Sequence, residues 1–372
     1  MTKEKKTRIW IAVATVVVLC VVSSFSNMRG WPENKSCPET RPAIKDALTQ
    51  CLDGDESIFF ASLSITHTGS AEEPYSYTLS RNNDGSYSDR FSNDLHIIPI
   101  VPGGIMQVAT AAFFLDEGKI SLDQTLPTDH GKLAEVPGSP TDVHIVDYEM
   151  ESGKDSISIK DGLLGSFRYV TDRYLLDLNK EPNYYNLWPK FINWRIGSYF
   201  GWDPAQFIPK SIYRQSTIKD VACGVADGHD LMFSQLQILT FFDCIANNGI
   251  RHRHSRYIPS RRLFQSKTAT EVAALLRDNV TSGTGILLSK SSVAIAGKTG
   301  AGTIRMGWIP TRSRVESSSP VNVSSFVGFF PADNPKYTMC VSVYCPEGNY
   351  KTGSAVRAFG QVVKQLNDEG LL

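Results

Sequence analysis

The sequence predicts an α+β fold in which helices pack against an antiparallel sheet. Three successive segments in the last third of the chain have the composition of strands, and an amphipathic helix follows them directly. Two more strand-like segments stand near the start of the folded region, before a series of helix-like segments. Runs of strands and runs of helices that are separated along the chain are typical of this fold class, because each apolar sheet face must be covered by another layer.

The folded domain is expected to begin near Ser57 with the edge of the sheet. Residues 58–65 are rich in strand-forming side chains and lead to a break at Gly69. Residues 75–79 form a second run of this kind, and Asn83-Asp84-Gly85 supplies a turn after it.

Helices are expected to fill the middle of the chain. After Gly104, apolar residues recur at helical spacing up to Phe113, and Gly118 follows as a natural C-terminal cap. We expect this helix to be buried. More helix is predicted over residues 159–178, 188–200 and 233–246.

The last third changes from helical to strand periodicity. Three strands are predicted in a row, over residues 293–299, 326–330 and 337–344. A terminal amphipathic helix follows, with its apolar side chains at Val356, Phe359, Val363 and Leu366. The sequence contains no internal repeat and no second boundary, so we expect one domain over residues 57–372.

The N-terminus carries a signal for membrane insertion. Four basic residues within positions 1–8 precede an apolar run over residues 9–22, which extends weakly to Phe25. The run is short for a span of about 20 residues, so a cleaved signal peptide competes with an uncleaved anchor. We expect a cytoplasmic tail (1–8), an anchor (9–25), a linker with one short helix (26–56), and a periplasmic domain at the inner membrane. Cleavage would give a secreted protein instead.

Composition excludes several classes of partner. The chain has 372 residues, 41% of them apolar, which is ample for a globular core. Lysine plus arginine and aspartate plus glutamate number 38 each, so no overall field favours nucleic acid. The histidines and cysteines do not show metal-ligand spacing, and no metal or cofactor is expected. Cys37 and Cys51 could close a disulfide, which would contribute about 3 kcal/mol in the chain-entropy model.

Several short motifs occur in a characteristic order. They are Val101-Pro102-Gly103-Gly104-Ile105-Met106-Gln107, the segment 231–249, Ser282-Gly283-Thr284-Gly285, Gly297-Lys298-Thr299-Gly300 and the segment 328–337. A Lys-Thr-Gly tripeptide alone is a weak signal, whereas the ordered set is specific. Over residues 57–372 the chain resembles the transpeptidase domain of class B penicillin-binding proteins, most closely the division-type peptidoglycan transpeptidases. The resemblance implies the fold shared with serine β-lactamases, and an N-terminal membrane anchor.

The residues that carry the chemistry of this family are changed. The family needs a serine that is activated by a lysine three residues later on the same helix face. Gly104 and Gln107 occupy those positions, and they supply neither a nucleophile nor a base at neutral pH. The family's Ser-x-Asn element is matched by Ser166-Phe167-Arg168, in which the serine is kept and arginine replaces asparagine.

Lys298, Thr299 and Gly300 remain, and two explanations of them are open. One is structural, because a glycine lets a neighbouring backbone approach the strand closely. The other is that Lys298 and Thr299 bind a carboxylate, as the resemblance implies for the substrate. Arg168 could add a second anion-binding group or pair with an acidic neighbour.

The resemblance and its departures lead to three functional hypotheses. The first is a catalytically inactive homologue that acts as a scaffold, a regulator or a non-covalent binder of peptidoglycan stem peptides, with wall-synthesis or division proteins as partners. The second is an active DD-transpeptidase or carboxypeptidase that uses a displaced serine, Ser166 or Ser216. Ser216-Thr217-Ile218-Lys219 is the only intact Ser-x-x-Lys in the chain, and we interpret it as a chance match. The third is a reversible sensor of β-lactams or muropeptides.

Overall fold

A computed structural model describes residues 40–72, 74–90, 99–128, 155–167, 169–171, 173–174, 233–252, 260–304, 320–348 and 350–372. The predicted membrane segment, the predicted helix over residues 188–200, Cys37, Arg168 and Ser216 lie outside these ranges. Among the helices that are described, none combines the length and the apolar character needed to cross a membrane.

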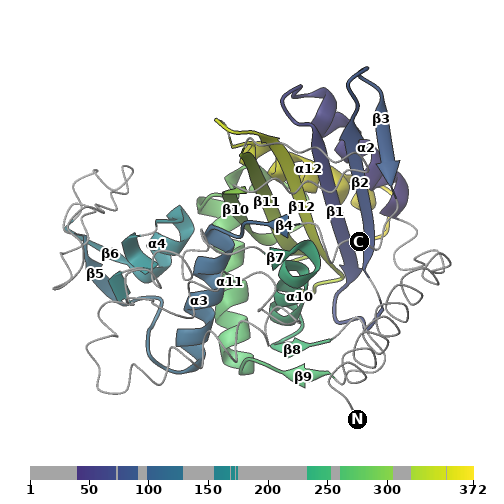
Figure 1. The fold of residues 1–372 in the computed structure, drawn as a ribbon. Coiled ribbons are helices and arrows are strands. Elements are labelled where there is room, and N and C mark those ends of the chain that lie inside the picture. Colours follow the sequence, from purple (N-terminus) through teal and green to yellow (C-terminus); the bar gives the residue numbers. More distant parts are fainter. Residues whose placement is uncertain are drawn as a thin grey trace, which may run out of the picture. The chain divides into compact units, whose positions relative to one another are not determined.

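A six-stranded antiparallel sheet forms the centre of the fold (Figure 1). Its strand order is β10-β11-β12-β1-β2-β3. The strands are β1 (Phe60–His67), β2 (Tyr75–Arg81), β3 (Tyr87–Arg90), β10 (Ala296–Ile304), β11 (Val321–Phe330) and β12 (Tyr337–Pro346). β1 pairs with β12 from Phe60↔Tyr344 to His67↔Tyr337. The first strands of the domain thus join the last ones, and the antiparallel sheet predicted from the sequence is confirmed.

Helices cover both faces of this sheet (Figure 1). On one face α2 (Arg41–Asp53) and α12 (Thr352–Asp368) share a core with side chains of β1, β11 and β12. On the other face a second core joins the sheet to α3 (Gly104–Asp116), α4 (Ile159–Gly165), α10 (Gln235–Ala246) and α11 (Ser266–Ser282). The α+β class and its helical layers are therefore as predicted.

The remaining elements are short. They are β4 (Pro99–Ile100), β5 (Thr125–Pro127), β6 (Ser156–Ser158), β7 (Phe233–Ser234), β8 (Ile250–Arg251), β9 (Arg261–Arg262) and the 3-10 helix η9 (Ile286–Leu288). β4 pairs with β7, which places the chain just before α3 beside the chain just before α10.

α3 is buried on all sides, as the sequence predicted. Every residue from Ile105 to Phe114 is buried, because the helix passes between the sheet and the other helices of its layer. The helix ends at Asp116 with Glu117 as its C-cap, and Gly118 takes a left-handed conformation with φ of 65°. This is the C-terminal glycine cap expected from the sequence.

Residues 41–53, which the sequence analysis placed in a linker, belong to the core. α2 buries one face against α12 and β1, with Ala43, Ile44, Ala47, Leu48, Cys51 and Leu52 at 9% exposure or less. The short helix predicted there is present, but it packs as part of the domain rather than joining it to another segment. Pro32 and Pro38 before the helix, and Pro42 in its first turn, obscured this apolar stripe in the sequence.

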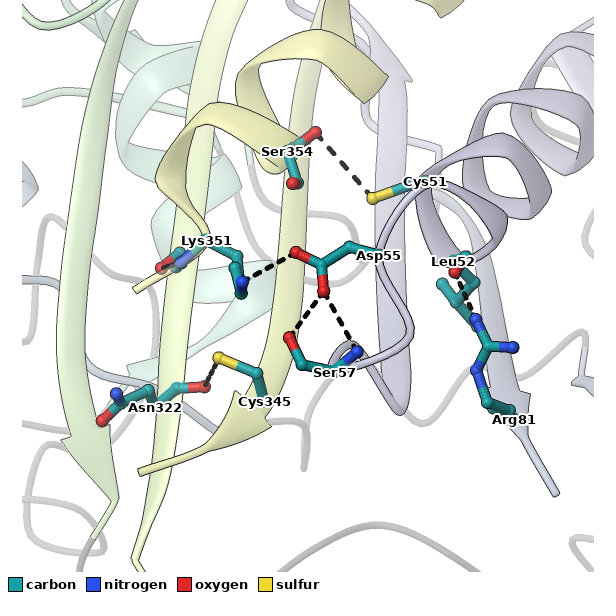
Figure 2. Close-up of polar contacts among 10 residues, drawn as sticks. Cys51, Leu52, Asp55, Ser57, Arg81, Asn322, Cys345, Lys351 and Ser354 are labelled. Atoms are coloured by element: carbon teal, nitrogen blue, oxygen red, sulfur yellow. Dashed lines mark hydrogen bonds and ion pairs between the residues drawn. The ribbon is translucent and has the colours of Figure 1, made fainter. Parts of the chain in front are cut away.

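Polar contacts fix the C-terminal end of α2 to the start of α12 (Figure 2). Asp55 accepts hydrogen bonds from the Ser57 backbone N–H (3.0 Å) and hydroxyl (2.6 Å), and it forms an ion pair with Lys351 at 2.8 Å. The hydrogen bond from Lys351 is the main reason that the pKa of Asp55 lies below its usual value.

Cys51 is described as a free thiol, and because Cys37 lies outside the described residues, the disulfide considered for Cys37 and Cys51 stays a prediction. The Cys51 Sγ lies 3.9 Å from the carbonyl oxygen of Ser354 on α12 (Figure 2). Burial, with a smaller effect of Asp55, raises the pKa of this thiol to about 11. The Cys51 side chain is 9% exposed and belongs to the core that α2 shares with α12.

A buried carboxyl group on α10 ties the helix to the sheet. Asp243 Oδ1 accepts hydrogen bonds from the Gly69 backbone N–H (3.0 Å) and from the Thr338 hydroxyl (3.3 Å). Burial outweighs these bonds and raises the pKa of Asp243 to about 7. The unfolded chain, with a pKa near 3.8, therefore releases this proton at lower pH than the folded protein does.

Stability should consequently fall between about pH 4 and pH 7 because of Asp243, and level off above pH 7. The folded state binds one more proton than the unfolded state in this window, which gives a loss of about 3 kcal/mol from pH 5 to pH 8. Asp243→Asn keeps an oxygen acceptor and removes the titration. We expect the difference in urea-unfolding free energy between variant and wild type to change by this amount over that range. A pH-independent difference would contradict the assignment.

Candidate active site

Elements that are far apart in the sequence meet at the start of α3. Gly104 is the first residue of α3, Ser166 caps the C-terminal end of α4, and Lys298 and Thr299 lie on β10. The Thr284 backbone N–H donates to the carbonyl oxygen of Leu164 at 3.2 Å, which joins the end of α11 to α4. The structure thus brings together residues that the sequence analysis selected from three separate motifs.

Two glycines allow α3 to approach β10 this closely. Gly103 has φ of 48°, and a Cβ there would lie 2.3 Å from the carbonyl oxygen of Ala301. A Cβ on Gly300 would lie 2.3 Å from the carbonyl oxygen of Pro102 and 2.6 Å from Cδ1 of Ile105. Both separations are far below contact distance, so only glycine fits. Gly300 therefore has the structural role suggested for it, close approach of a neighbouring backbone.

Gly300→Ala should separate α3 from β10 and destabilise the protein by about 3 kcal/mol. The methyl group would overlap a backbone oxygen, which cannot move without shifting the helix. Gly353→Ala is the matched control, because Gly353 lies within α12 and the nearest atom to its new methyl group would be Arg357 Nη1 at 3.5 Å. This control should change stability by about 1 kcal/mol or less. Equal urea midpoints for the two variants would contradict the close packing.

Lys298 is the centre of the site and is only 1% exposed. Its Nζ donates to Ser166 Oγ, to Thr284 Oγ1 (3.2 Å), and to the Thr299 carbonyl oxygen and hydroxyl (both 3.4 Å). Within the described ranges, none of the salt bridges involves this amine. We call Lys298, Ser166, Thr284, Thr299 and Gly104 the Lys298 cluster.

Burial without a counter-ion lowers the pKa of Lys298 to about 7. An exposed lysine is protonated at neutral pH, whereas this amine is divided between its charged and neutral forms. In the neutral form its lone pair can accept a proton. The cluster therefore contains a potential general base.

The hydroxyl groups around Lys298 are ordered by a chain of hydrogen bonds. Thr299 Oγ1 donates to Thr284 Oγ1 at 2.6 Å, and Thr284 Oγ1 donates to Asn279 Oδ1 at 3.2 Å. The side-chain amide of Asn279 in turn donates to the carbonyl oxygen of Gly297 at 2.9 Å. Each threonine proton thus has a defined acceptor away from the amine.

Thr284 and Asn279 were not among the predicted site residues. Thr284 lies in Ser282-Gly283-Thr284-Gly285, which the sequence analysis used only as a marker of resemblance. The only signal in the sequence for a role of Thr284 was its position between two glycines, Gly283 and Gly285. Asn279 is buried on α11 and carried no such signal.

At Gly104, the amine and the serine lie against the position where a side chain would begin. A Cβ built there would lie 2.9 Å from Lys298 Nζ, 3.0 Å from Ser166 Oγ and 3.1 Å from the carbonyl oxygen of Thr299. Lys298 and Ser166 therefore occupy part of the volume that a side chain at position 104 would need. The site offers neither a hydroxyl nor a thiol at this position.

Gln107 lies one turn further along α3 and is 2% exposed. Its Nε2 donates to the carbonyl oxygen of Ser166 at 3.4 Å. Its Oε1 is buried and makes no hydrogen bond within the described part of the chain. The amide thus helps to position the Ser166 loop and does not provide a base.

Ser166 ends α4 in a left-handed conformation, with φ of 58° and ψ of 33°. The helix predicted over residues 159–178 is therefore interrupted after Gly165. This conformation is uncommon for a residue with a side chain, and it turns the chain so that Ser166 Oγ contacts Lys298. The side chain is half-buried, in contrast to the fully buried amine.

Comparison with known proteins agrees with this architecture. The sequence profile of the penicillin binding protein transpeptidase domain matches residues 72–366. The chain therefore belongs to the penicillin-binding-protein transpeptidase family, and the class B resemblance fits the match. No curated protein matches the chain.

Solved structures share the fold at low sequence identity. A peptidoglycan synthetase from Bifidobacterium adolescentis superposes with a TM-score of 0.65 at 14% identity, over 90% of this chain and 61% of that chain. The transpeptidase domain of Burkholderia pseudomallei penicillin-binding protein 3 gives 0.65 at 18%, over 92% of this chain and 98% of that one. A peptidoglycan glycosyltransferase from Burkholderia ambifaria gives 0.63 at 17%, over 90% and 96%. This chain thus spans less than two thirds of the Bifidobacterium protein.

Proposed function

We propose that this protein binds the stem peptide of peptidoglycan without performing transpeptidation, and that it acts as a scaffold or regulator of cell-wall synthesis or division. The observation that carries the proposal is Gly104. It stands at the start of α3, facing Lys298 and Ser166, where the family places its nucleophilic serine. Three departures occur together, at Gly104, Gln107 and Arg168, while the fold and the Lys298 cluster are kept.

The retained groups suit a peptide ligand. The cluster combines a lysine with hydroxyl groups, and amines and hydroxyls recognise carboxylates and peptide carbonyls through hydrogen bonds. Two of the structural neighbours, a peptidoglycan synthetase and a peptidoglycan glycosyltransferase, support this choice of ligand class. The loss of the nucleophile at position 104 means that binding at this point need not lead to turnover there.

The N-terminal sequence supports a location outside the cytoplasm. Residues 9–25 would anchor the protein in the inner membrane, with the domain on the periplasmic side, next to peptidoglycan. The alternative is cleavage after this segment, which would release the same domain into the periplasm or give a secreted protein. Wall-synthesis or division proteins would then be reached at the membrane surface.

Calorimetric titration of the full-length protein in detergent with a synthetic stem pentapeptide tests the proposal. We expect measurable binding, weakened by about 10-fold or more in Lys298→Met because the cluster loses its amine. Lys267→Met is the matched control, since the Lys267 side chain is 84% exposed on α11 and lies in no predicted site. It should bind like wild type.

Two results would contradict the proposal. Absence of peptide binding would remove the assigned ligand. Formation of a crosslinked product from donor and acceptor peptides, followed by mass spectrometry, would show that the protein is a working transpeptidase.

A further inference from the structure

We propose that Asn279 is a positioning residue of the Lys298 cluster, which directs the protons of Thr284 and Thr299 away from the Lys298 amine and thereby keeps this amine a hydrogen-bond donor. The inference rests on the proposed function, because a protonated amine binds the carboxylate of a stem peptide more strongly than a neutral amine does. Asn279 lies in the last turn of α11, and its side chain is 1% exposed.

The orientation of the Asn279 side-chain amide is fixed by the sheet. Its Nδ2 donates to the carbonyl oxygen of Gly297 on β10 at 2.9 Å. A carbonyl oxygen can only accept, so the nitrogen of the amide must face β10 and the oxygen must face away from it. Asn279 Oδ1 accordingly lies 3.3 Å from Thr284 N and 3.2 Å from Thr284 Oγ1. An acceptor therefore stands beside the Thr284 hydroxyl.

The amide oxygen sets the direction of both threonine hydroxyls. Because Asn279 Oδ1 can only accept, Thr284 has to donate its proton to it. Thr284 Oγ1 is then left with its lone pairs, and it accepts from Thr299 Oγ1 at 2.6 Å and from Lys298 Nζ at 3.2 Å. Thr299 Oγ1 has donated its own proton and faces the amine as a further acceptor, at 3.4 Å. Both threonines thus present oxygen lone pairs, and not protons, to Lys298.

The loop that carries Thr284 is shaped around the Asn279 side chain. A Cβ on Gly283 would lie 2.6 Å from Asn279 Oδ1, and a Cβ on Gly285 would lie 3.3 Å from Asn279 Nδ2. The backbone N–H groups of Gly283 and Gly285 donate to the Asn279 backbone carbonyl oxygen at 3.0 and 3.1 Å. Because these backbone bonds do not involve the side chain, they should persist when residue 279 is changed. The position of the loop and the direction of its hydroxyl proton can therefore be tested separately.

Ionised groups in the described part of the chain do not take over this role. β10 and β11 contain no charged residue except Lys298. Burial, and not an ionised neighbour, lowers the pKa of Lys298. The charged residues on the other described elements that meet at the amine are Asp116 of α3, Lys160 and Asp161 of α4, and Lys267, Glu271, Arg277 and Asp278 of α11. Of these, Asp278 pairs with Lys160 at 2.6 Å, and Arg277 donates to the carbonyl oxygen of Ile295.

Loss of the Asn279 acceptor should favour the neutral amine. In Asn279→Leu, the Thr284 hydroxyl has no amide oxygen to donate to, and its proton can turn to Thr299 Oγ1 or to the lone pair of a neutral Lys298 Nζ. A hydrogen bond to the charged form is then replaced by one to the neutral form, which lowers the pKa of a lysine. We expect the pKa of Lys298 to fall by about one unit. Asn279 in wild type thus extends the pH range in which the amine binds a carboxylate.

Nuclear magnetic resonance of the full-length protein in detergent, with its lysines labelled with ¹³C at Cε, measures this pKa. The Lys298 resonance is the one that is missing from Lys298→Met. Asn279→Leu and Asn279→Asp form the decisive pair, because both lose the nitrogen that bonds to Gly297, whereas only aspartate keeps an oxygen for the Thr284 proton. We expect the pKa of Lys298 to fall in the leucine variant and to stay at or above the wild-type value in the aspartate variant. Thr281→Val, at an exposed position on α11, is the control and should match wild type.

Equal shifts in the two Asn279 variants would mean that Asn279 acts only as a bridge to β10, and they would overturn the inference. An unchanged pKa of Lys298 in folded Asn279→Leu would do so as well. If Asn279→Leu does not fold, Thr284→Val removes the hydroxyl itself and should also lower the pKa, and an unchanged or raised value there would count equally against Asn279.

The resonance titration needs no peptide, so it is independent of the stem-peptide titration. Peptide binding without the pKa shift would reject the role of Asn279 and leave the proposed function standing. The pKa shift without peptide binding would do the reverse.

Discussion

Gly104→Ser combined with Gln107→Lys is expected to create penicillin acylation at position 104, where wild type has no group to react. The new hydroxyl would lie at the start of α3 and the new amine one turn later on the same face. Activated nucleophiles of this kind accelerate acyl transfer by about 10³-fold or more over sites without them. Mass spectrometry of the labelled peptide that contains position 104 measures the effect.

The structure defines what must move for this variant to work. The Cβ at position 104 would stand 2.9 Å from Lys298 Nζ and 3.0 Å from Ser166 Oγ, which are both ends of side chains. A shift of a few tenths of an ångström relieves each contact. The 3.1 Å contact of this Cβ with the Thr299 carbonyl oxygen is harder to relieve, because that oxygen belongs to the β10 backbone.

Single variants separate the contributions of the two positions. Gly104→Ser alone should label more slowly than the double variant, since Gln107 gives it no base at that distance. Gln107→Lys alone should leave position 104 unlabelled. Circular dichroism establishes whether each variant is folded. A folded double variant without an adduct at position 104 would mean that more than these two residues prevents acylation.

Periodicity and motif order were enough to predict the sheet and the grouping of the site. The strands β11 and β12 and the helix α12 have strong patterns, and the structure contains each of them. β10 begins at Ala296 and runs to Ile304, later than predicted, because Gly300 and Gly302 weakened the strand signal in its second half. Lys298 and Ser166 were selected from separate motifs and are in contact.

Features that depend on tertiary packing were not predicted. α11 was not assigned from the sequence, although it buries Val272, Leu275, Leu276 and Val280 on one face. The role of Thr284 depends on the direction of its hydroxyl proton, which is set by Asn279 across a loop. The break at Ser166 depends on a left-handed conformation that the residue itself does not favour.

The free energy of unfolding of Lys298→Met, taken relative to that of wild type, is expected to be greater at neutral pH than at alkaline pH. Lys298 has a pKa of about 7 when folded and 10.5 as its ordinary value. Between these two values the unfolded state holds one more proton than the folded state, so wild-type stability rises with pH. From pH 7 to pH 10 this contribution is about 3 kcal/mol.

The variant lacks this titration and serves as the reference. The difference in unfolding free energy between Lys298→Met and wild type, measured in urea at pH 7, 8, 9 and 10, should fall steadily over this range. Other lysines and tyrosines titrate equally in both proteins and cancel. Lys267→Met, at an exposed position, should show a constant difference from wild type.

The sign of this result bears on why the lysine is present. Below pH 7 the buried charge destabilises the fold, and the hydroxyls of Ser166, Thr284 and Thr299 offset only part of the cost, at about 1 kcal/mol for each hydrogen bond. A purely structural residue at this position would be expected to be apolar, because methionine fills similar volume without a desolvation penalty. If the variant gains stability at pH 7 and loses stem-peptide binding, the amine is retained for the ligand. If it loses both, Lys298 instead holds β10, α4 and α11 together, and the case for a ligand must rest on Ser166 and Thr299.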